Sequence, residues 1–290
     1  MILARLKGGL GNQMFEYAAA RALALRHGAE LKLDLEYLQD RTPRPKPFRI
    51  TFRSYGLDAF NIASTIATRA ETPLGFLGKA GMLIDFCYRR LLKPVGTERH
   101  FHFDPAFLSF PDGTYLDGLW QSPKYFAGYE DAIRDDFRLK GELPEATRSL
   151  GAEMAACRSV CVHVRRADFI GSKHETCDKD YYDRGIAEIG KQGGIDRIYV
   201  FSDDAAWCRE NLSLGFPTTF VGDEHSGPKG TGHLYLMGKC RSFVIANSSF
   251  SWWAAWLAES PGKIVVAPRR WFSDESVDSG DVTPSEWIRI

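Results

Sequence analysis

The chain has 290 residues, and its 37 Lys and Arg residues balance 37 Asp and Glu residues, so the formal net charge is zero. A chain without net charge exerts no general attraction on nucleic acid or on an anionic membrane, so we expect no nucleic-acid partner. Any anionic ligand must then be held by a local cluster of charges. The length suits one large domain or two of ordinary size.

The first apolar run, residues 2–6, is too short for a signal peptide, and no later run is long enough to span a bilayer. We therefore expect a cytoplasmic protein without a transmembrane segment. The six cysteines lack the paired C-x-x-C spacing of zinc sites, so we expect reduced thiols.

A glycine-rich turn follows the first predicted strand. Residues 2–6 form the strand, the glycines lie at positions 8, 9 and 11, and a helix is predicted over residues 14–25. Such a turn lets the backbone approach a ligand and aims the N–H groups of the helix start at it, although it also fits an ordinary connection. A second strand at residues 30–34 completes a strand–helix–strand unit, which is typical of a parallel sheet.

The middle of the chain is less regular. The polar stretch near residues 140–150 predicts a domain boundary, which gives domains of residues 1–150 and 151–290. Before it we predict an exposed loop over 41–57, helical structure within 62–92, a strand at 114–120 and a helix at 122–137.

From residue 160 onward, short apolar strands alternate with helical patterns, which is typical of a doubly wound parallel sheet. We therefore predict a second α/β domain in this half of the chain. Its strands are predicted at 160–164, 198–201, 218–221, 242–246 and 263–267, with helices near 180–191, 204–212, 231–240 and 250–259.

Two arginines, Arg165 and Arg166, directly follow the apolar strand at 160–164. Ligands of open α/β sheets bind beyond the carboxyl ends of the strands, and the planar fork of arginine matches a phosphate or carboxylate. The pattern thus predicts an anion site. The competing interpretation is an ordinary ion pair, for example with Asp168.

The residues that follow the other strands support a nucleotide diphosphate as the anion. Asp203 and Asp204 follow one strand, and a carboxylate can accept a hydrogen bond from the amino edge of guanine. Residues 247–251 (Asn-Ser-Ser-Phe-Ser) follow another strand and offer hydroxyls and helix-start N–H groups for phosphate. His163 alternates with its valine neighbours, so it fits a core histidine as well as a base contact.

Other conspicuous residues have simpler explanations. Trp252 and Trp253 are predicted to fill the core, and Arg269-Arg270 is predicted to be a solvated strand end. The D-x-D motif at residues 178–180 does not follow an apolar strand, so we disfavour a metal-dependent transferase of the GT-A type.

Several motifs in register resemble the bacterial α-1,2-fucosyltransferases of glycosyltransferase family 11. They are Gly8-Gly9-Leu10-Gly11-Asn12-Gln13-Met14-Phe15, His163-Val164-Arg165-Arg166-x-Asp168 and Ile245-Ala246-Asn247-Ser248-Ser249-Phe250-Ser251-Trp252-Trp253. The stretch Leu116-Asp117-Gly118-x-Trp120-Gln121-Ser122-x-Lys124-Tyr125-Phe126 fits the same family. The resemblance runs from residue 2 almost to 270 and is weakest over 40–100.

The resemblance implies a GT-B fold, in which two Rossmann-like domains face each other across a cleft. Residues 1–150 would then serve the acceptor side, and residues 151–290 would hold the donor GDP-L-fucose. It further implies metal-independent, inverting transfer of fucose to the 2-hydroxyl of a galactose-terminated oligosaccharide during glycan or O-antigen synthesis. A lipid-linked acceptor would be compatible with peripheral association at the inner face of the membrane.

The resemblance also implies residue roles. Arg165 would contact the β-phosphate, and Arg165, Asp168 and Asn12 are the predicted catalytic residues. The predicted donor-binding residues are Gly11 and Asn12 on the fucose and phosphate side, His163, Asp203 and Asp204 at the guanosine end, and Ser248, Ser249, Phe250 and Ser251 at the phosphates, together with Arg165, Arg166 and Asn247.

Two residues depart from the family pattern, namely Glu16 where Gln is usual and Ala167 where Gly is usual. For the acceptor hydroxyl, Asp168 is the first candidate base, with Glu16 a distant second. A role of Asp168 in orienting an arginine is an equal alternative to its role as the base.

Two other functions remain open. The chain could transfer fucose to a protein hydroxyl or to a chitin-type oligosaccharide, since those relatives share the arginine motif and the glycine turn. It could also bind a GDP-sugar without catalysis.

Overall fold

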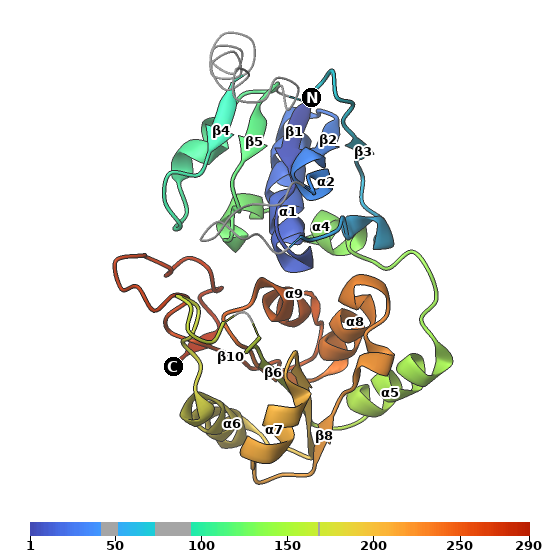
Figure 1. The fold of residues 1–290 in the computed structure, drawn as a ribbon, viewed down its shortest axis with the longest axis vertical. Coiled ribbons are helices and arrows are strands. Elements are labelled where there is room, and N and C mark those ends of the chain that lie inside the picture. The colour runs from blue at the N-terminus through green and yellow to red at the C-terminus, as the bar shows by residue number, and fades with distance from the viewer. Residues whose placement is uncertain (42–51, 73–93, 168) are drawn as a thin grey trace. The chain divides into compact units, whose positions relative to one another are not determined.

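The computed structural model describes residues 1–41, 52–72, 94–167 and 169–290 (Figure 1). These residues form two compact units, Met1–Lys140 and Gly141–Ile290. The boundary lies ten residues before the predicted one at 150. The reason is helix α5 (Glu145–Ala155), which packs against α8 (Thr231–Lys239) of the second unit.

The first unit contains a sheet whose described strands are all parallel and lie in the order β3-β2-β1-β5-β4. Its central strand β1 is apolar, and three of its four residues are buried. The bounds are β1 Ile2–Arg5, β2 Leu31–Asp34, β3 Thr65–Ile66, β4 Val95–Thr97 and β5 Tyr115–Asp117.

The long helix α1 (Leu10–His27) packs on β1 and β2 and ends at Gly28, whose φ of 60° permits the left-handed cap (Figure 1). The helix predicted over 122–137 is interrupted by Gly128, with a φ of 86°. The remaining elements are α2 Glu36–Gln39, α4 Glu130–Asp136 and the 3₁₀ turns η1 Leu57–Ala59, η2 Pro105–Ser109 and η3 Pro123–Phe126.

The helix predicted within 62–92 is wrong where it can be compared, because Thr65 and Ile66 pair with Lys32 and Leu33 as strand β3. Residues 73–93 lie outside the described residues, as do residues 42–51 of the predicted loop. The sequence there mixes apolar and polar residues without a clear period, so pattern alone did not separate strand from helix.

The second unit contains a parallel sheet in the order β11-β10-β9-β6-β7-β8. The five predicted strands are confirmed, and the edge strand β11 was not predicted. The bounds are β6 Ser159–Val164, β7 Arg197–Ser202, β8 Thr218–Phe220, β9 Ser242–Val244, β10 Val265–Ala267 and β11 Ile288–Arg289.

Helices cover both faces of this sheet, as predicted for a doubly wound domain. Val160, Val162 and Val164 of β6 pack with the tyrosines of α6, whereas the alternate residue His163 faces Phe250 of α9. Trp252 and Trp253 are fully buried, which confirms their core role. The described helices are α5, α8, α6 Lys179–Gln192, α7 Ala205–Asn211 and α9 Ser249–Leu257, with 3₁₀ turns η4 Asp223–His225 and η5 Pro228–Gly230.

The strand order fixes where a ligand can bind in each unit. In the second unit the chain proceeds from β6 to β7 and β8 on one side and to β9, β10 and β11 on the other. The crevice at such a reversal, beyond the carboxyl ends of β6 and β9, is the usual ligand position in open α/β sheets. In the first unit the corresponding point lies between β1 and β5.

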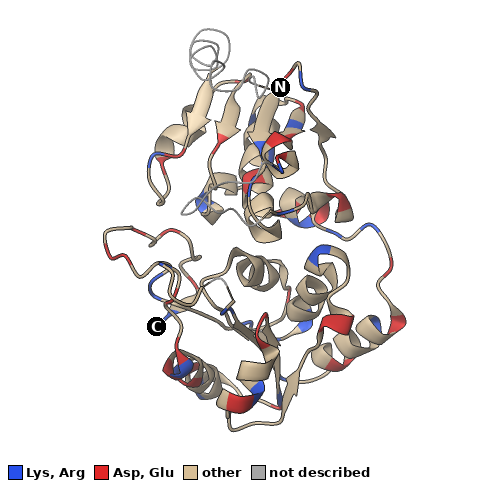
Figure 2. Cartoon of the chain, viewed as in Figure 1, with Lys and Arg blue, Asp and Glu red and all other residues tan. Residues whose placement is uncertain are grey.

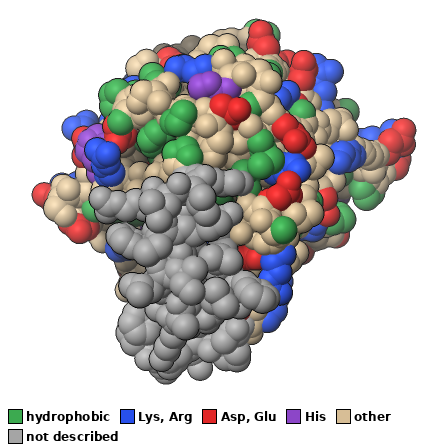
Figure 3. Space-filling model, turned by 90° about the horizontal axis from the view of Figure 1, so that it is seen from above, with side chains coloured by type: hydrophobic (Ala, Val, Ile, Leu, Met, Phe, Trp, Pro, Cys, Tyr) green, Lys and Arg blue, Asp and Glu red, His purple; other side chains and the backbone are tan. Residues whose placement is uncertain are grey.

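Charged residues of both signs occur along both units (Figure 2), and the face seen in Figure 3 carries acidic, basic and apolar side chains among its described residues. In the part of the chain that the structure describes, none of the helices has the length and apolarity needed to cross a membrane.

Candidate functional site

Arg165 and Arg166 lie at the carboxyl end of β6, where the sequence predicts them. All six residues of the strand are buried, and the side chains of the two arginines that follow are 26% and 25% exposed. The buried strand therefore delivers two charged groups to the point where the strand order reverses.

Asp203 braces the loop that follows β6. Its Oδ2 lies 3.1 Å from Nε of Arg165, and its carboxylate accepts the backbone N–H groups of Arg166 (2.9 Å) and Ala167 (3.2 Å). The parallel register, which pairs Val164 with Ser202, brings these loops together. Asp203 thus contacts both Arg165 and the backbone that follows it, and its predicted contact with guanosine stays a prediction. Asp168 lies outside the described residues.

Arg166 is held by α7. Its Nε lies 3.2 Å from Oδ2 of Asp204, and its guanidinium carbon lies 3.7 Å from the centroid of the Trp207 ring. Asp204 also caps the helix, since its Oδ1 accepts the backbone N–H of Trp207 at 3.1 Å. These contacts fix Arg166 and Asp204 against α7, and the donor contacts predicted for both residues stay predictions.

His163 is a buried neutral imidazole beside this site. Its ring is 6.3 Å from that of Phe250, and its Nδ1 has no hydrogen-bond partner among the described residues. Burial, together with the charges of Arg165 and His233, lowers the pKa of His163 to about 3. An orphaned buried nitrogen of this kind can bond to an incoming polar ligand.

The loop after β9 divides into framework and open residues. Nδ2 of Asn247 donates to the carbonyls of His174 (3.0 Å) and Trp271 (2.8 Å), and the buried hydroxyl of Ser251 donates to the carbonyl of Ser248 (3.2 Å). Both side chains thus bond to the backbone, and the donor contacts predicted for them stay predictions.

Ser248, Ser249 and Phe250 are half-buried at the start of α9. Ser248 occupies the N-cap position without a capping bond from its side chain. The start of a helix combines N–H donors with the positive end of the helix dipole, which suits an anion. These three residues therefore remain consistent with the predicted phosphate contacts.

In the first unit, the glycine turn is fixed by close contacts. Gly8 has a φ of 72°, and a Cβ atom at this position would lie 2.6 Å from Nδ2 of Asn12. Oδ1 of Asn12 accepts a hydrogen bond from Nε2 of Gln121 at 2.9 Å. Gly11 is buried at the first turn of α1. The turn therefore links α1 to the segment after β5.

Sequence reasoning missed Gln13 as a site residue. Its Nε2 donates to the carbonyls of Gly8 (3.0 Å) and Ser54 (2.9 Å), and its Oε1 accepts the N–H of Gly56 (2.9 Å). The side chain is fully buried and ties the turn to residues 54–56. A single Gln near a helix start carries no periodic signal, and only its adjacency to the glycines could have singled it out.

Charged side chains surround the ends of β1 and β5. Asp117 accepts from Nζ of Lys7 (2.5 Å) and Nη1 of Arg5 (3.2 Å). Burial opposes ionisation of Asp117, but Lys7 and Arg5 hold its pKa below the ordinary value. Glu98 accepts the N–H groups of Leu119 (3.0 Å) and Trp120 (3.1 Å).

The described residues do not group three or more His, Cys, Asp or Glu side chains in an arrangement that could hold a metal ion. Asp178 of the D-x-D motif is the N-cap of α6, where its Oδ1 accepts the N–H of Tyr181 at 2.8 Å. The fold thus explains this motif.

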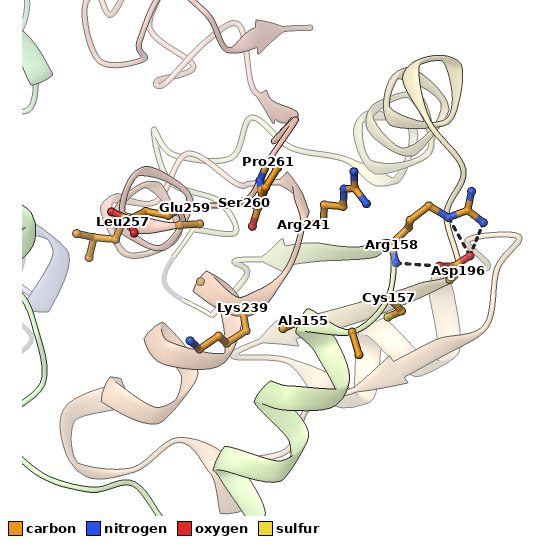
Figure 4. Close-up of a pocket in the computed structure, with 13 residues that line it drawn as sticks. Ala155, Cys157, Arg158, Asp196, Lys239, Arg241, Leu257, Glu259, Ser260 and Pro261 are labelled. Atoms are coloured by element: carbon orange, nitrogen blue, oxygen red, sulfur yellow. Dashed lines mark hydrogen bonds and ion pairs between the residues drawn. The ribbon is translucent and has the colours of Figure 1, made fainter.

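A cavity of about 650 Å³ lies at the amino ends of the strands of the second sheet, opposite the ends that carry Arg165 and Arg166. Its wall includes Arg158, Asp196 and Arg241, which precede β6, β7 and β9 (Figure 4). Arg158 is committed to Asp196, with Nε 3.0 Å from Oδ1. None of the predicted site residues lines this cavity.

Comparisons with known proteins agree with these features. A profile of the family described as "Glycosyl transferase family 11" matches residues 99–290. An Escherichia coli alpha-1,2-colitosyltransferase is 29% identical over 100% of this chain and 99% of its own length. The E. coli O-antigen biosynthesis glycosyltransferase WbnK is 29% identical over 98% and 99%. A mouse galactoside 2-alpha-L-fucosyltransferase, Sec1, is 25% identical over 89% of this chain and 64% of its own length.

Among solved structures, NodZ alpha-1,6-fucosyltransferase soaked with GDP-fucose superposes with a TM-score of 0.52 at 19% identity, covering 91% of this chain and 94% of that one. This likeness concerns the fold alone. Together with the two parallel α/β units, it confirms the predicted GT-B class.

Proposed function

The chain belongs to glycosyltransferase family 11, and from this premise we propose that it transfers L-fucose from GDP-L-fucose to the 2-hydroxyl of a terminal galactoside, with inversion at the sugar. The observation that carries the proposal is the arrangement beyond β6, where Asp203 holds Arg165 at the point of strand reversal. The acceptor would be a galactose-terminated oligosaccharide in glycan or O-antigen synthesis.

Arg165 stabilises the departing GDP in this mechanism. Breaking the bond between fucose and phosphate builds positive charge on the sugar and negative charge on the diphosphate, and preorganised donors aimed at that charge lower the barrier most. The side chains of Arg165 and Asp203 are 26% and 19% exposed, so their ion pair contributes little stability and can yield to phosphate at small cost. The start of α9 adds backbone donors.

His163 contributes a hydrogen bond without a charge. Since burial keeps its imidazole neutral, it does not compete with Arg165 for the phosphates. Its orphaned Nδ1 suits the polar edge of the guanosine portion.

We propose that the reaction needs no metal, because a guanidinium and a helix start supply the positive charge that a divalent ion would otherwise bring. Asp168, three residues after Arg165, is the proposed base for the acceptor hydroxyl. Asn12 and Gly11 are proposed to contact the fucose and phosphate side from the first unit. We also propose that the enzyme acts in the cytoplasm, on an acceptor presented at the inner face of the membrane.

A second donor deserves a direct test. A full-length E. coli relative is named an alpha-1,2-colitosyltransferase, and its linkage matches the one proposed here. A donor carrying colitose would place the same demands on Arg165 and differ only at the sugar. Other acceptors, such as a protein hydroxyl or a chitin-type oligosaccharide, and GDP-sugar binding without catalysis are the remaining alternatives.

The experiment is GDP release in EDTA from GDP-fucose and from GDP-colitose, with lactose or N-acetylglucosamine as acceptor, for the wild type and Arg165→Lys. Lysine keeps the charge and loses the fork. We expect lactose-dependent release from GDP-fucose and a loss of about a hundredfold in the variant, equivalent to about 3 kcal/mol. Turnover of GDP-colitose but not of GDP-fucose would mean that the enzyme transfers colitose instead of fucose. If the protein bound GDP but turned over none of the donor and acceptor pairs, it would be a GDP-sugar-binding protein without catalytic activity.

A further inference from the structure

Glu16 is a buried carboxyl group directly beneath the glycine turn. It lies in α1, is 1% exposed, and accepts the backbone N–H of Lys7 through Oε2 at 2.8 Å. Its other oxygen, Oε1, is also buried and has no hydrogen-bond partner among the described residues. An ionised carboxylate in this position would have one of its two oxygens unsolvated, which is costly.

Two acids and two bases surround Glu16, and both bases pair with the same acid. Asp117 on β5 and Glu98 after β4 face Glu16, as does Lys7 after β1, and Arg5 of β1 pairs with Asp117. Both cations bond to Asp117, at 2.5 and 3.2 Å. Glu98 is compensated by two backbone N–H groups, and Glu16 by one. Of the three carboxyl groups, Glu16 is therefore the least compensated.

We propose that Glu16 works as a neutral carboxylic acid that positions the glycine turn, with Oε2 accepting the N–H of Lys7 and Oε1 carrying the proton. Glu16 touches no substrate in this role and acts through the backbone at Lys7 and Gly8. The consequence for catalysis rests on the proposed function, in which the turn presents Gly11 and Asn12 to the donor.

The electrostatics support this state. Burial raises the pKa of Glu16 well above the ordinary value, the N–H and charge of Lys7 oppose that rise, and Asp117 and Glu98 add to it. Ionisation would place a third negative charge among these carboxylates and change the acceptor that fixes the N–H of Lys7. In this proposal, the hydrogen bond that fixes the turn is accepted by a protonated, neutral Glu16 and not by an ionised one.

The protonation can be measured without any activity. The infrared spectrum of the full chain at pH 7.5, wild type minus Glu16→Gln, should show the carbonyl band of a protonated carboxyl group. The control is Glu71→Gln, because the side-chain bond to Lys32 and the bonds to Thr68 hold the pKa of Glu71 at about 2, so its removal should leave that band unchanged. A Glu16 difference spectrum with only carboxylate bands would overturn the proposal.

The positioning role is tested by kinetics. Glu16→Leu leaves the N–H of Lys7 without an acceptor and should raise the KM for GDP-fucose by about tenfold. Glu16→Gln restores a neutral acceptor of the same shape and should recover most of that loss. We also expect kcat/KM of the wild type to decline at alkaline pH, where Glu16 would ionise, and we expect Glu16→Gln to lack this decline. Equal KM values for wild type and Glu16→Leu would refute the role.

The two readouts separate this proposal from the proposed function. A protein that shows the protonated band but transfers no sugar retains a neutral Glu16 and loses only the assigned reaction. A protein that transfers fucose but lacks the band keeps the reaction and contradicts the neutral acid.

Discussion

Oδ2 of Asp203 lies 3.1 Å from Nε of Arg165, and the same carboxylate accepts two consecutive backbone N–H groups of the loop after β6. One side chain therefore fixes both the loop and the guanidinium that it carries. Such a group acts on a ligand through its effect on the geometry of the arginine.

Asp203→Asn tests this relationship. The amide keeps the shape and loses the charge and one acceptor, so Arg165 is oriented less well. We expect kcat/KM for GDP-fucose to fall by about tenfold, or ~1.4 kcal/mol, with normal folding by circular dichroism. Asp196→Asn is the matched control, because Asp196 also pairs with an arginine, Arg158, but at the amino ends of the strands, away from the proposed site. Equal effects of the two variants would indicate a loss of general stability instead.

Arg166→Lys should act on stability more than on catalysis. The guanidinium packs on Trp207 at 3.7 Å and pairs with Asp204, so lysine loses a stacked contact worth about 1 kcal/mol. We expect the Tm to fall by ~2–4 °C. Its kcat/KM should fall far less than that of Arg165→Lys. A reversed order of the two kinetic effects would make Arg166 the phosphate ligand.

The sequence predicted where the two arginines lie but not that each pairs with a different carboxylate. A buried strand ending in Arg165 and Arg166 is visible in the pattern, whereas the point at which the strand order reverses is known only from the structure. Which carboxylate pairs with which arginine depends on the register of β6 and β7, where Val164 lies beside Ser202. That register is a long-range property, and it places Asp203 against Arg165, a contact that the sequence did not predict.

Local chemistry also hid some elements. Helix α5 lies in a polar stretch near Gly141 and Pro144, where turn residues outweighed a weak helical period. Asn247 and Ser251 are of residue types that often bind ligands, yet in this structure their side chains donate hydrogen bonds to backbone carbonyls. Composition shows which bonds a side chain can make, and packing decides where it makes them.

His163 should make the folded protein less stable as the pH falls. Burial and then Arg165 lower its folded pKa to about 3, below the ordinary value of 6.5 that holds in the unfolded chain. Stability from the neutral imidazole is therefore complete above about pH 6.5 and declines below it, because only the unfolded chain takes up the proton. The slope is at most about 1.4 kcal/mol per pH unit.

The measurement is the free energy of unfolding in urea at several pH values between 4.5 and 8, for the wild type and His163→Gln. Other titrating groups contribute to both proteins and cancel in the difference. We expect the wild type to lose its advantage over the variant progressively below about pH 6.5. A difference independent of pH would mean that His163 takes up a proton equally well in the folded state.

Gly8→Ala should damage the glycine turn by both strain and collision. The φ of 72° is unfavourable for alanine, and the new Cβ atom would lie 2.6 Å from Nδ2 of Asn12, whose Oδ1 bonds to Gln121. Gly113→Ala is the matched control, since Gly113 has a φ of 88° but no atom within 4 Å of a Cβ. We expect each variant to lose ~1–3 kcal/mol of stability from strain. Only Gly8→Ala should also raise the KM for GDP-fucose, because it alone displaces Asn12. If both variants raised the KM alike, the effect would come from stability, and the turn would have no part in donor binding.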